Sequence, residues 1–102
     1  MNLDAITLEK IYQVLKQEKK IKNILLFGSR AKGTAKKGSD IDLAIVGDDI
    51  SFRDMCAFAM KLDELDLPYK IDLVDYNAIT NQELKDHIDR VSISLVSFAN
   101  QE

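Results

Sequence analysis

Apolar residues recur along this chain with two periods, one typical of helices and one typical of strands. A helical period with charged residues between its apolar positions covers about residues 3–18 and predicts an amphipathic helix. A short apolar run at 21–27 ends at Gly28 and predicts a buried strand. Small, basic and glycine residues at 29–39 predict a loop. Residues 40–46 then alternate apolar and polar side chains, which predicts a second strand with two distinct faces.

A second amphipathic helix is expected over residues 52–66, opened by a weak N-cap at Ser51 and ended by Pro68. Its core-facing side is predicted from six apolar positions: Phe52, Met55, Cys56, Ala59, Leu62 and Leu65. A third strand follows at 69–75, with Ile71 and Leu73 on one face and Asp72 and Val74 on the other.

Thr80 and Glu83 have the spacing of a capping box and predict a last helix over about residues 81–90. The tail, residues 91–98, fits either a strand or a helical period, and a short strand or extended segment is favoured. The predicted order is therefore α-β-β-α-β-α. This order indicates an α/β (α+β) fold in which helices flank a small mixed sheet.

Length and composition restrict what such a chain can do. The 102 residues fit a single domain spanning 1–102, and the net charge of −3 gives no sign of a basic nucleic-acid-binding face. No apolar run reaches the roughly 20 residues that span a bilayer. Cys56 is the only cysteine, which suits a reducing compartment. A cytoplasmic protein is expected, and a homo-oligomer is left open.

Three aspartates carry the candidate chemistry. Asp40 and Asp42 are two apart on the predicted second strand, so their carboxylates share one face with Cα atoms about 6–7 Å apart. Like charges this close resist ionisation unless a cation lies between them. Oxygen ligands of this kind suit Mg²⁺, which typically takes one or two protein carboxylates together with substrate phosphates. Asp72 can complete the cluster if the third strand neighbours the second.

An anion site is predicted just upstream. Gly28 follows the first strand and allows the backbone to turn, and Ser29 can cap that turn and offer a hydroxyl. Free N–H groups at such a turn bind phosphate. Arg30 and Lys32 can add positive charge there, although plain loop charges are an equal alternative.

Gly28-Ser29, ten intervening residues and Asp40-Ile41-Asp42 together resemble the signature of the DNA polymerase β-like nucleotidyltransferase superfamily. Residues 27–33 and 39–43 are similar to the minimal nucleotidyltransferase (MNT) branch, and the resemblance spans nearly the whole chain. It implies a polymerase β palm-like fold with Asp40, Asp42 and Asp72 on adjacent strands. The C-terminal segment 89–92 departs from the family because it lacks an expected glycine.

The resemblance also implies an activity. Asp40 and Asp42 would bind Mg²⁺, and Asp72 would be the third carboxylate of a site that holds two Mg²⁺ ions. Asp72 would also serve as base. A nucleotide, AMP from ATP, would move to a hydroxyl acceptor. MNT proteins resemble antitoxins that adenylylate a helical HEPN-domain partner. Two alternatives stay open: a nucleotide-binding module that masks a HEPN partner with little or no catalysis, and an enzyme acting on a small molecule such as an antibiotic.

Overall fold

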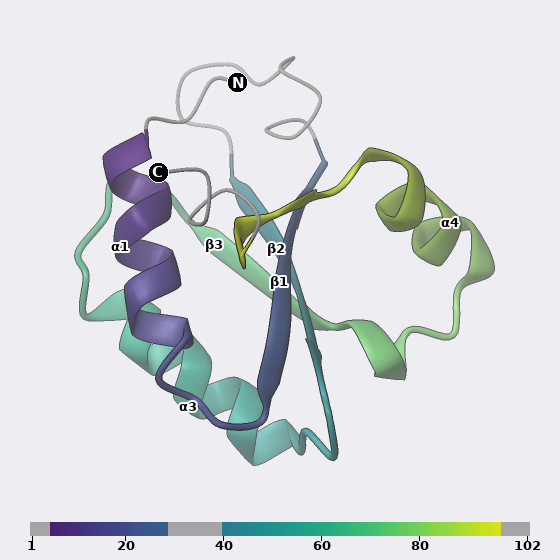
Figure 1. The fold of residues 1–102 in the computed structure, drawn as a ribbon, viewed down its shortest axis with the longest axis horizontal. Coiled ribbons are helices and arrows are strands. Elements are labelled where there is room, and N and C mark those ends of the chain that lie inside the picture. Colours follow the sequence, from purple (N-terminus) through teal and green to yellow (C-terminus); the bar gives the residue numbers. More distant parts are fainter. Residues whose placement is uncertain (1–4, 29–39, 97–102) are drawn as a thin grey trace.

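The computed structural model describes residues 5–28 and 40–96 of the chain. A four-stranded mixed sheet lies at its centre, with helices on both faces (Figure 1). The elements in chain order are α1 (Ala5–Leu15), β1 (Ile21–Phe27), β2 (Ile41–Gly47), α3 (Phe52–Asp63), β3 (Ile71–Asp75), the 3-10 turn η1 (Tyr76–Ala78), α4 (Gln82–Val91) and β4 (Ile93–Ser94). The predicted order and fold class are confirmed, and β4 adds a fourth strand to them.

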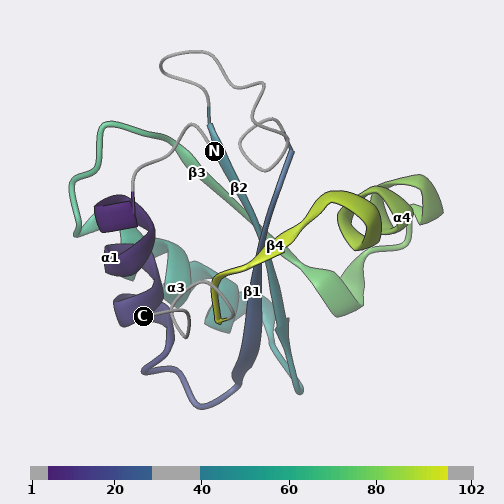
Figure 2. The same cartoon turned by 45° about the horizontal axis from the view of Figure 1, so that its top comes forward.

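The strands lie in the order β3-β2-β1-β4. β1 pairs antiparallel with both β2 and β4, whereas β2 pairs parallel with β3. A parallel pair needs a crossover connection, and α3 supplies it between β2 and β3. The favoured short strand in the tail is confirmed only for residues 93–94, at the far edge of the sheet (Figure 2), because Val91 still belongs to α4 and residues 95–96 are helical. The end of the tail lies outside the described residues.

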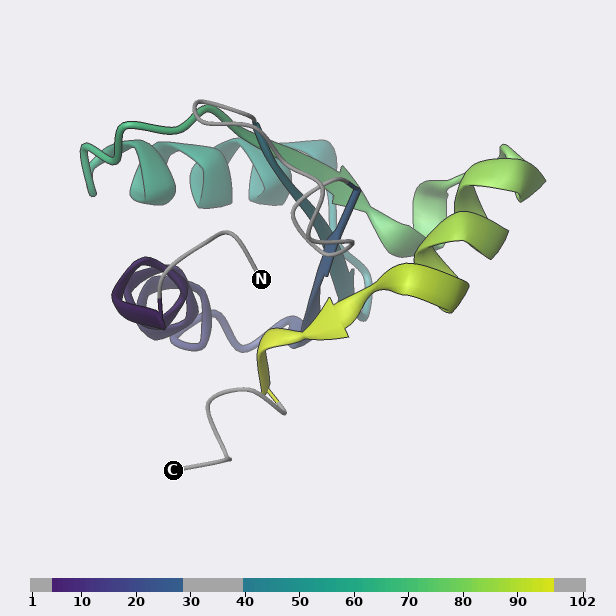
Figure 3. The same ribbon diagram turned by 90° about the horizontal axis from the view of Figure 1, so that it is seen from above.

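Each face of the sheet has its own apolar core. α1 and α3 cover one face and α4 covers part of the other (Figure 3). The larger core, under α1 and α3, is built on the alternate β2 residues Ile41, Leu43 and Ile45, all fully buried. The smaller core joins Phe27 and Ala44 to Ile88 of α4. Asp42 and Asp72 therefore point toward the α4 side, as the alternation predicted.

The core-facing side predicted for α3 is half right, because Met55, Leu62 and Leu65 pack on the larger core. Phe52 is 84% exposed, and Cys56 and Ala59 are also exposed, although all three had been placed on the core side. Phe58, which is not among the six predicted positions, is buried together with Leu62. Apolar residues occur on both sides of this helix, so the sequence pattern alone does not decide which side meets the core.

Two predicted helix boundaries also need correction. α3 ends at Asp63, well before Pro68, and Asp66 at φ 51° then carries the chain through a left-handed turn, so the proline does not stop the helix. For α4 the N-cap is Asn81, whose side chain accepts a hydrogen bond from the Leu84 N–H. The capping box expected at Thr80 is therefore not formed. None of the helices within the described ranges has the length and apolarity to cross a membrane.

The start of α3 is held by a capping box joined to an ion pair. The Ser51 hydroxyl accepts from the Asp54 N–H, and the Asp54 carboxylate accepts from the Ser51 N–H. Lys20 lies 2.8 Å from the same carboxylate and ties the segment before β1 to this helix. The hydrogen bond from Lys20, followed by those from Ser51, lowers the pKa of Asp54 to about 2.

We therefore expect Asp54→Asn to lower the free energy of unfolding at pH 7. The pKa of Asp54 is lower in the folded state than in the unfolded state, so its contribution is complete above the ordinary value near 4 and fades as the pH falls toward about 2. Urea denaturation of both proteins between pH 7 and pH 3 measures this. The difference between them should shrink on acidification. Asp63→Asn, at the opposite end of α3, is the control and should cost nothing because a negative charge there opposes the helix dipole.

Candidate active site

The pairing of β2 with β3 places two aspartates side by side. Asp42 and Asp72 are direct partners in the parallel register. Neighbouring strands lie about 4.8 Å apart, and paired residues present their side chains on the same face. Both residues are partly buried. The third strand therefore neighbours the second, as Asp72 requires in order to join the cluster.

Asp40 lies just before β2, two residues from Asp42, and is exposed. Its charge acts on Asp42 through space. Three carboxylates thus come from two adjacent strand ends, with Asp42 between the other two.

Gly28 lies against Asp42 from the β1 side, opposite Asp72. Asp42 is paired with Phe27 of β1, and Gly28 follows directly at φ +78°. A Cβ atom at residue 28 would overlap the Asp42 Oδ2 atom, closer than real Cβ contacts come. Glycine is therefore required twice here, by the left-handed backbone and by the carboxylate that lies against it.

The electrostatics of the site are those of a crowded acidic group. The pKa of Asp42 is raised above its ordinary value, first by burial and then by the negative charges of Asp72 and Asp40. A group with this shift costs folding free energy when it ionises. At neutral pH the fold therefore carries an acidic cluster that works against its own stability, an arrangement typical of functional sites.

Among the described residues, Lys70 is a cation beside the cluster. Lys70 Nζ lies 3.9 Å from Asp72 Oδ1, and both side chains are substantially exposed. The sequence analysis missed Lys70, although it precedes Asp72 by two residues, a spacing that puts alternate residues on one side of an extended chain. An exposed pair of this kind contributes little stability, so Lys70 is free to exchange Asp72 for another anion.

The chemistry of the donor set fits Mg²⁺, which takes hard oxygen ligands and a few carboxylates. As the side chains stand, no three acidic, histidine or cysteine residues among those described converge closely enough to hold an ion. The strand register fixes the backbone positions of Asp42 and Asp72. Rotation about their side-chain bonds would bring the carboxylate oxygens together. Ser29 and Arg30, expected at the phosphate end, lie outside the described residues.

Comparison with protein families gives one decisive match. The family model described as "Polymerase beta, Nucleotidyltransferase" matches residues 9–101. The chain belongs to this nucleotidyltransferase family. A Haemophilus influenzae protein inferred to be the protein adenylyltransferase MntA is 40% identical over 68 residues, which span 66% of this chain and 59% of that protein. A Methanocaldococcus jannaschii protein inferred to be a protein adenylyltransferase is 32% identical over 80% of this chain and 84% of its own length.

Solved structures agree with this nucleotidyltransferase fold. A protein inferred to be a minimal nucleotidyltransferase superposes with a TM-score of 0.71 at 25% identity, over 90% of this chain and 96% of the other. A toxin-antitoxin structure with AMP-PNP gives a TM-score of 0.69 at 28% identity, over 91% of this chain and 73% of the other. The MNT antitoxin bound to a tri-AMPylated Shewanella oneidensis HEPN toxin gives 0.67 at 27% identity, over 88% and 69%.

We predict that Gly28→Ala destabilises the nucleotidyltransferase by about 1–2 kcal/mol, because the new methyl group meets both a positive φ and the Asp42 carboxylate. Urea denaturation at neutral pH measures the loss. The same change in an Asp42→Ala background should cost less, because only the backbone strain then remains. An equal cost in both backgrounds would show that residue 28 does not press on Asp42.

Asp42→Asn should raise the melting temperature in EDTA at pH 7. The raised pKa means that the ionised carboxylate is less stable in the folded protein than in the unfolded chain, and the amide removes that cost. The gain should diminish as the pH falls, because the wild-type carboxyl then becomes neutral too. Asp66→Asn, at an exposed turn, is the matched control and should leave the melting temperature unchanged.

Proposed function

We propose that this protein transfers a nucleotide, AMP from ATP, to a hydroxyl group of a HEPN-domain partner protein, with Mg²⁺ as cofactor, and so acts as an antitoxin. The observation that carries the proposal is the in-register pair Asp42 and Asp72 beside the Gly28 turn. It combines a carboxylate pair for a divalent cation with a backbone turn suited to phosphate. A role in the cytoplasm, where ATP is available, goes with it.

The relatives support the donor and the acceptor. Two similar proteins are inferred to be protein adenylyltransferases, which use a protein as acceptor. One similar structure contains AMP-PNP, and another holds an AMPylated HEPN toxin with its MNT antitoxin. The chain matches 59% of the length of the Haemophilus influenzae protein.

The residues would divide the work as follows. The triphosphate would lie with its phosphates at the turn opened by Gly28, where Ser29 and Arg30 would contact them. Asp40 and Asp42 would hold Mg²⁺, with Asp72 beside them as the third carboxylate. Mg²⁺, as one or two bound ions, supplies charge neutralisation for the phosphates and lowers the pKa of the attacking hydroxyl.

Asp72 would accept the proton of the acceptor hydroxyl, given hydrogen-bond reach. The acceptor oxygen forms a bond to the α-phosphorus, the bond from that phosphorus to the bridging oxygen of the β-phosphate breaks, and pyrophosphate leaves. Lys70, next to Asp72, is placed to pair with negative charge at this end of the site. The protein contributes positioning and electrostatic stabilisation, as in other phosphoryl transfers.

The test is a transfer assay with the full chain, Mg²⁺ and a co-purified partner protein. With α-³²P-labelled ATP we expect label on a protein band, and with γ-³²P-labelled ATP none, because pyrophosphate carries the γ-phosphate away. Asp42→Ala should reduce labelling by about 100-fold or more, as removal of a central electrostatic group does. Asp75→Ala is the control. Asp75 lies on the opposite face of β3 from Asp72, so this variant should retain labelling.

Other outcomes would redirect the assignment. Label from the γ-position would indicate a kinase. Label on a small molecule in place of protein would favour the antibiotic-modifying alternative. A tightly bound partner that stays unlabelled with every form of ATP would favour the binding module that masks its partner without catalysis.

A further inference from the structure

An apolar ridge lies on the outer side of α3. It consists of Phe52, Cys56 and Met60, and steps of four residues place its members in one row along the helix. Phe52 is 84% exposed, Met60 is 68% exposed and Cys56 is exposed. Phe52 and Met60 are two of the three large apolar residues exposed in the described part of the chain.

The ridge is unusual for a helix that already has a buried side. Phe58 and Leu62 pack into the core from the opposite side of α3, so the outer side should be polar. In the segment 52–60 the charged residues are only Arg53 and Asp54, and Asp54 is occupied by Lys20 and Ser51. An exposed apolar surface of this kind marks an interaction site.

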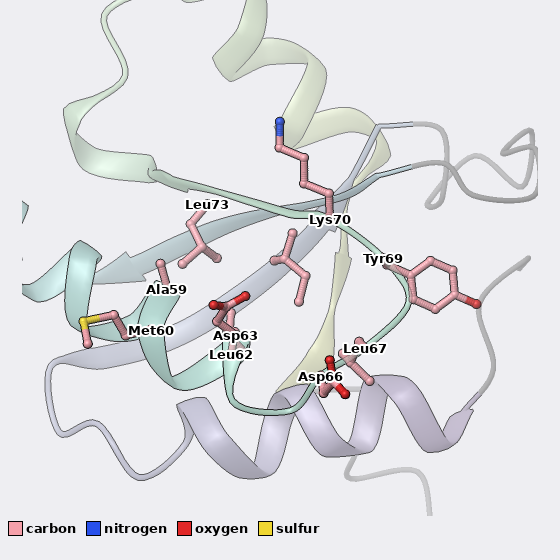
Figure 4. A pocket seen from close by; sticks show the side chains of 10 residues that line it. Ala59, Met60, Leu62, Asp63, Asp66, Leu67, Tyr69, Lys70 and Leu73 are labelled. Atoms are coloured by element: carbon pink, nitrogen blue, oxygen red, sulfur yellow. The ribbon is translucent and has the colours of Figure 1, made fainter.

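A cavity of about 350 Å³ adjoins the ridge (Figure 4). It lies between the C-terminal half of α3 and the start of the edge strand β3, and Ala59 and Met60 belong to its lining. Much of the remaining lining is apolar, from Leu67, Tyr69, Ile71 and Leu73. One surface of the molecule therefore carries both a protruding aromatic side chain, Phe52, and an apolar hollow.

We propose that this surface pairs with a second copy of the same chain, with the two α3 helices antiparallel across a twofold axis. Residues 52 and 60 are about 12 Å apart along the helix. An axis through the middle of the helix, near residue 58, sets Phe52 of each copy level with residue 64 of the other, within the stretch from Ala59 to Asp66 that lines the cavity. A twofold interface uses one patch twice and must contain both the projection and the hollow that receives it.

The charges of α3 fit the same arrangement. Arg53 lies near the start of the helix, and Asp63 and Glu64 lie at its end, all three exposed. The antiparallel pairing sets Arg53 of one copy against Asp63 and Glu64 of the other, and does so twice. In a parallel pairing like charges would meet, so the charges select the antiparallel orientation.

The candidate active sites would stay open in this dimer. Asp42 and Asp72 point to the α4 side of the sheet, whereas α3 covers the opposite face. The dimer therefore does not rest on the proposed function, and either can fail without the other.

Sedimentation equilibrium of the full chain tests the dimer. The wild type should dimerise with a dissociation constant in about the micromolar range. Phe52→Asp should weaken it by about 30-fold or more, as loss of a central aromatic anchor does. Ile6→Asp changes an apolar residue of α1 that is 70% exposed and should leave the dissociation constant unchanged. Thermal melts check that each variant folds. A wild type that stays monomeric at about millimolar concentration overturns the proposal.

Charge reversal tests the orientation. Arg53→Glu should weaken the dimer by about fivefold, and adding Glu64→Arg should restore it. Because Cys56 is the only cysteine, a short bismaleimide should also link two wild-type copies through one defined site. If neither Phe52→Asp nor the charge pair changes the dissociation constant, the dimer interface lies on another surface and the proposal is wrong. Binding of a different protein through Phe52 by a chain that does not self-associate also contradicts the proposal.

Discussion

The parallel pairing of β2 with β3 is the contact on which the rest of this structure depends. It sets Asp42 directly beside Asp72, and a shift of one residue would send one of the two carboxylates to the opposite face. The α3 crossover makes the parallel pairing possible, and the fully buried Ile41, Leu43 and Ile45 fix the register by holding one face of β2 in the core. The buried apolar residues of β2 thus determine the face on which Asp42 lies.

Stability and chemistry oppose each other at this point. The pKa of Asp42 is raised by burial and by two neighbouring carboxylates, so the folded protein loses free energy by keeping the group ionised. Burial of the larger core and capping of α3 contribute stabilising free energy that offsets this loss. A chain selected only for binding a partner would gain by replacing one of these aspartates. Their presence side by side is therefore the physical reason to propose that this member of the nucleotidyltransferase family binds a metal ion there.

Sequence patterns predicted the strands well because each strand has one face in the core, so that period two appears directly in the residues. They also predicted which side Asp42 and Asp72 occupy. They were half right at α3, where Met55, Leu62 and Leu65 meet the core as predicted but Phe52 faces outward, because apolar side chains lie on both sides of this helix. They failed at the cap of α4 because Thr80 and Asn81 are both residues that cap helices, and Asn81 is the one whose side chain accepts from the Leu84 N–H. Lys70 went unnoticed although its position two residues before Asp72 puts both side chains on one side of the extended chain.

Calorimetric titration with a non-cleavable ATP analogue, methylene-substituted between the α- and β-phosphates, tests the central claim that Asp42 and Asp72 form one metal–nucleotide site. We predict that the wild type binds the analogue with Mg²⁺ and only weakly in EDTA. Asp42→Asn should abolish the Mg²⁺-dependent part, Asp72→Asn should reduce it, and Asp75→Asn should leave it intact. Binding that is equally strong in EDTA, or unaffected by loss of either Asp42 or Asp72, would contradict the account.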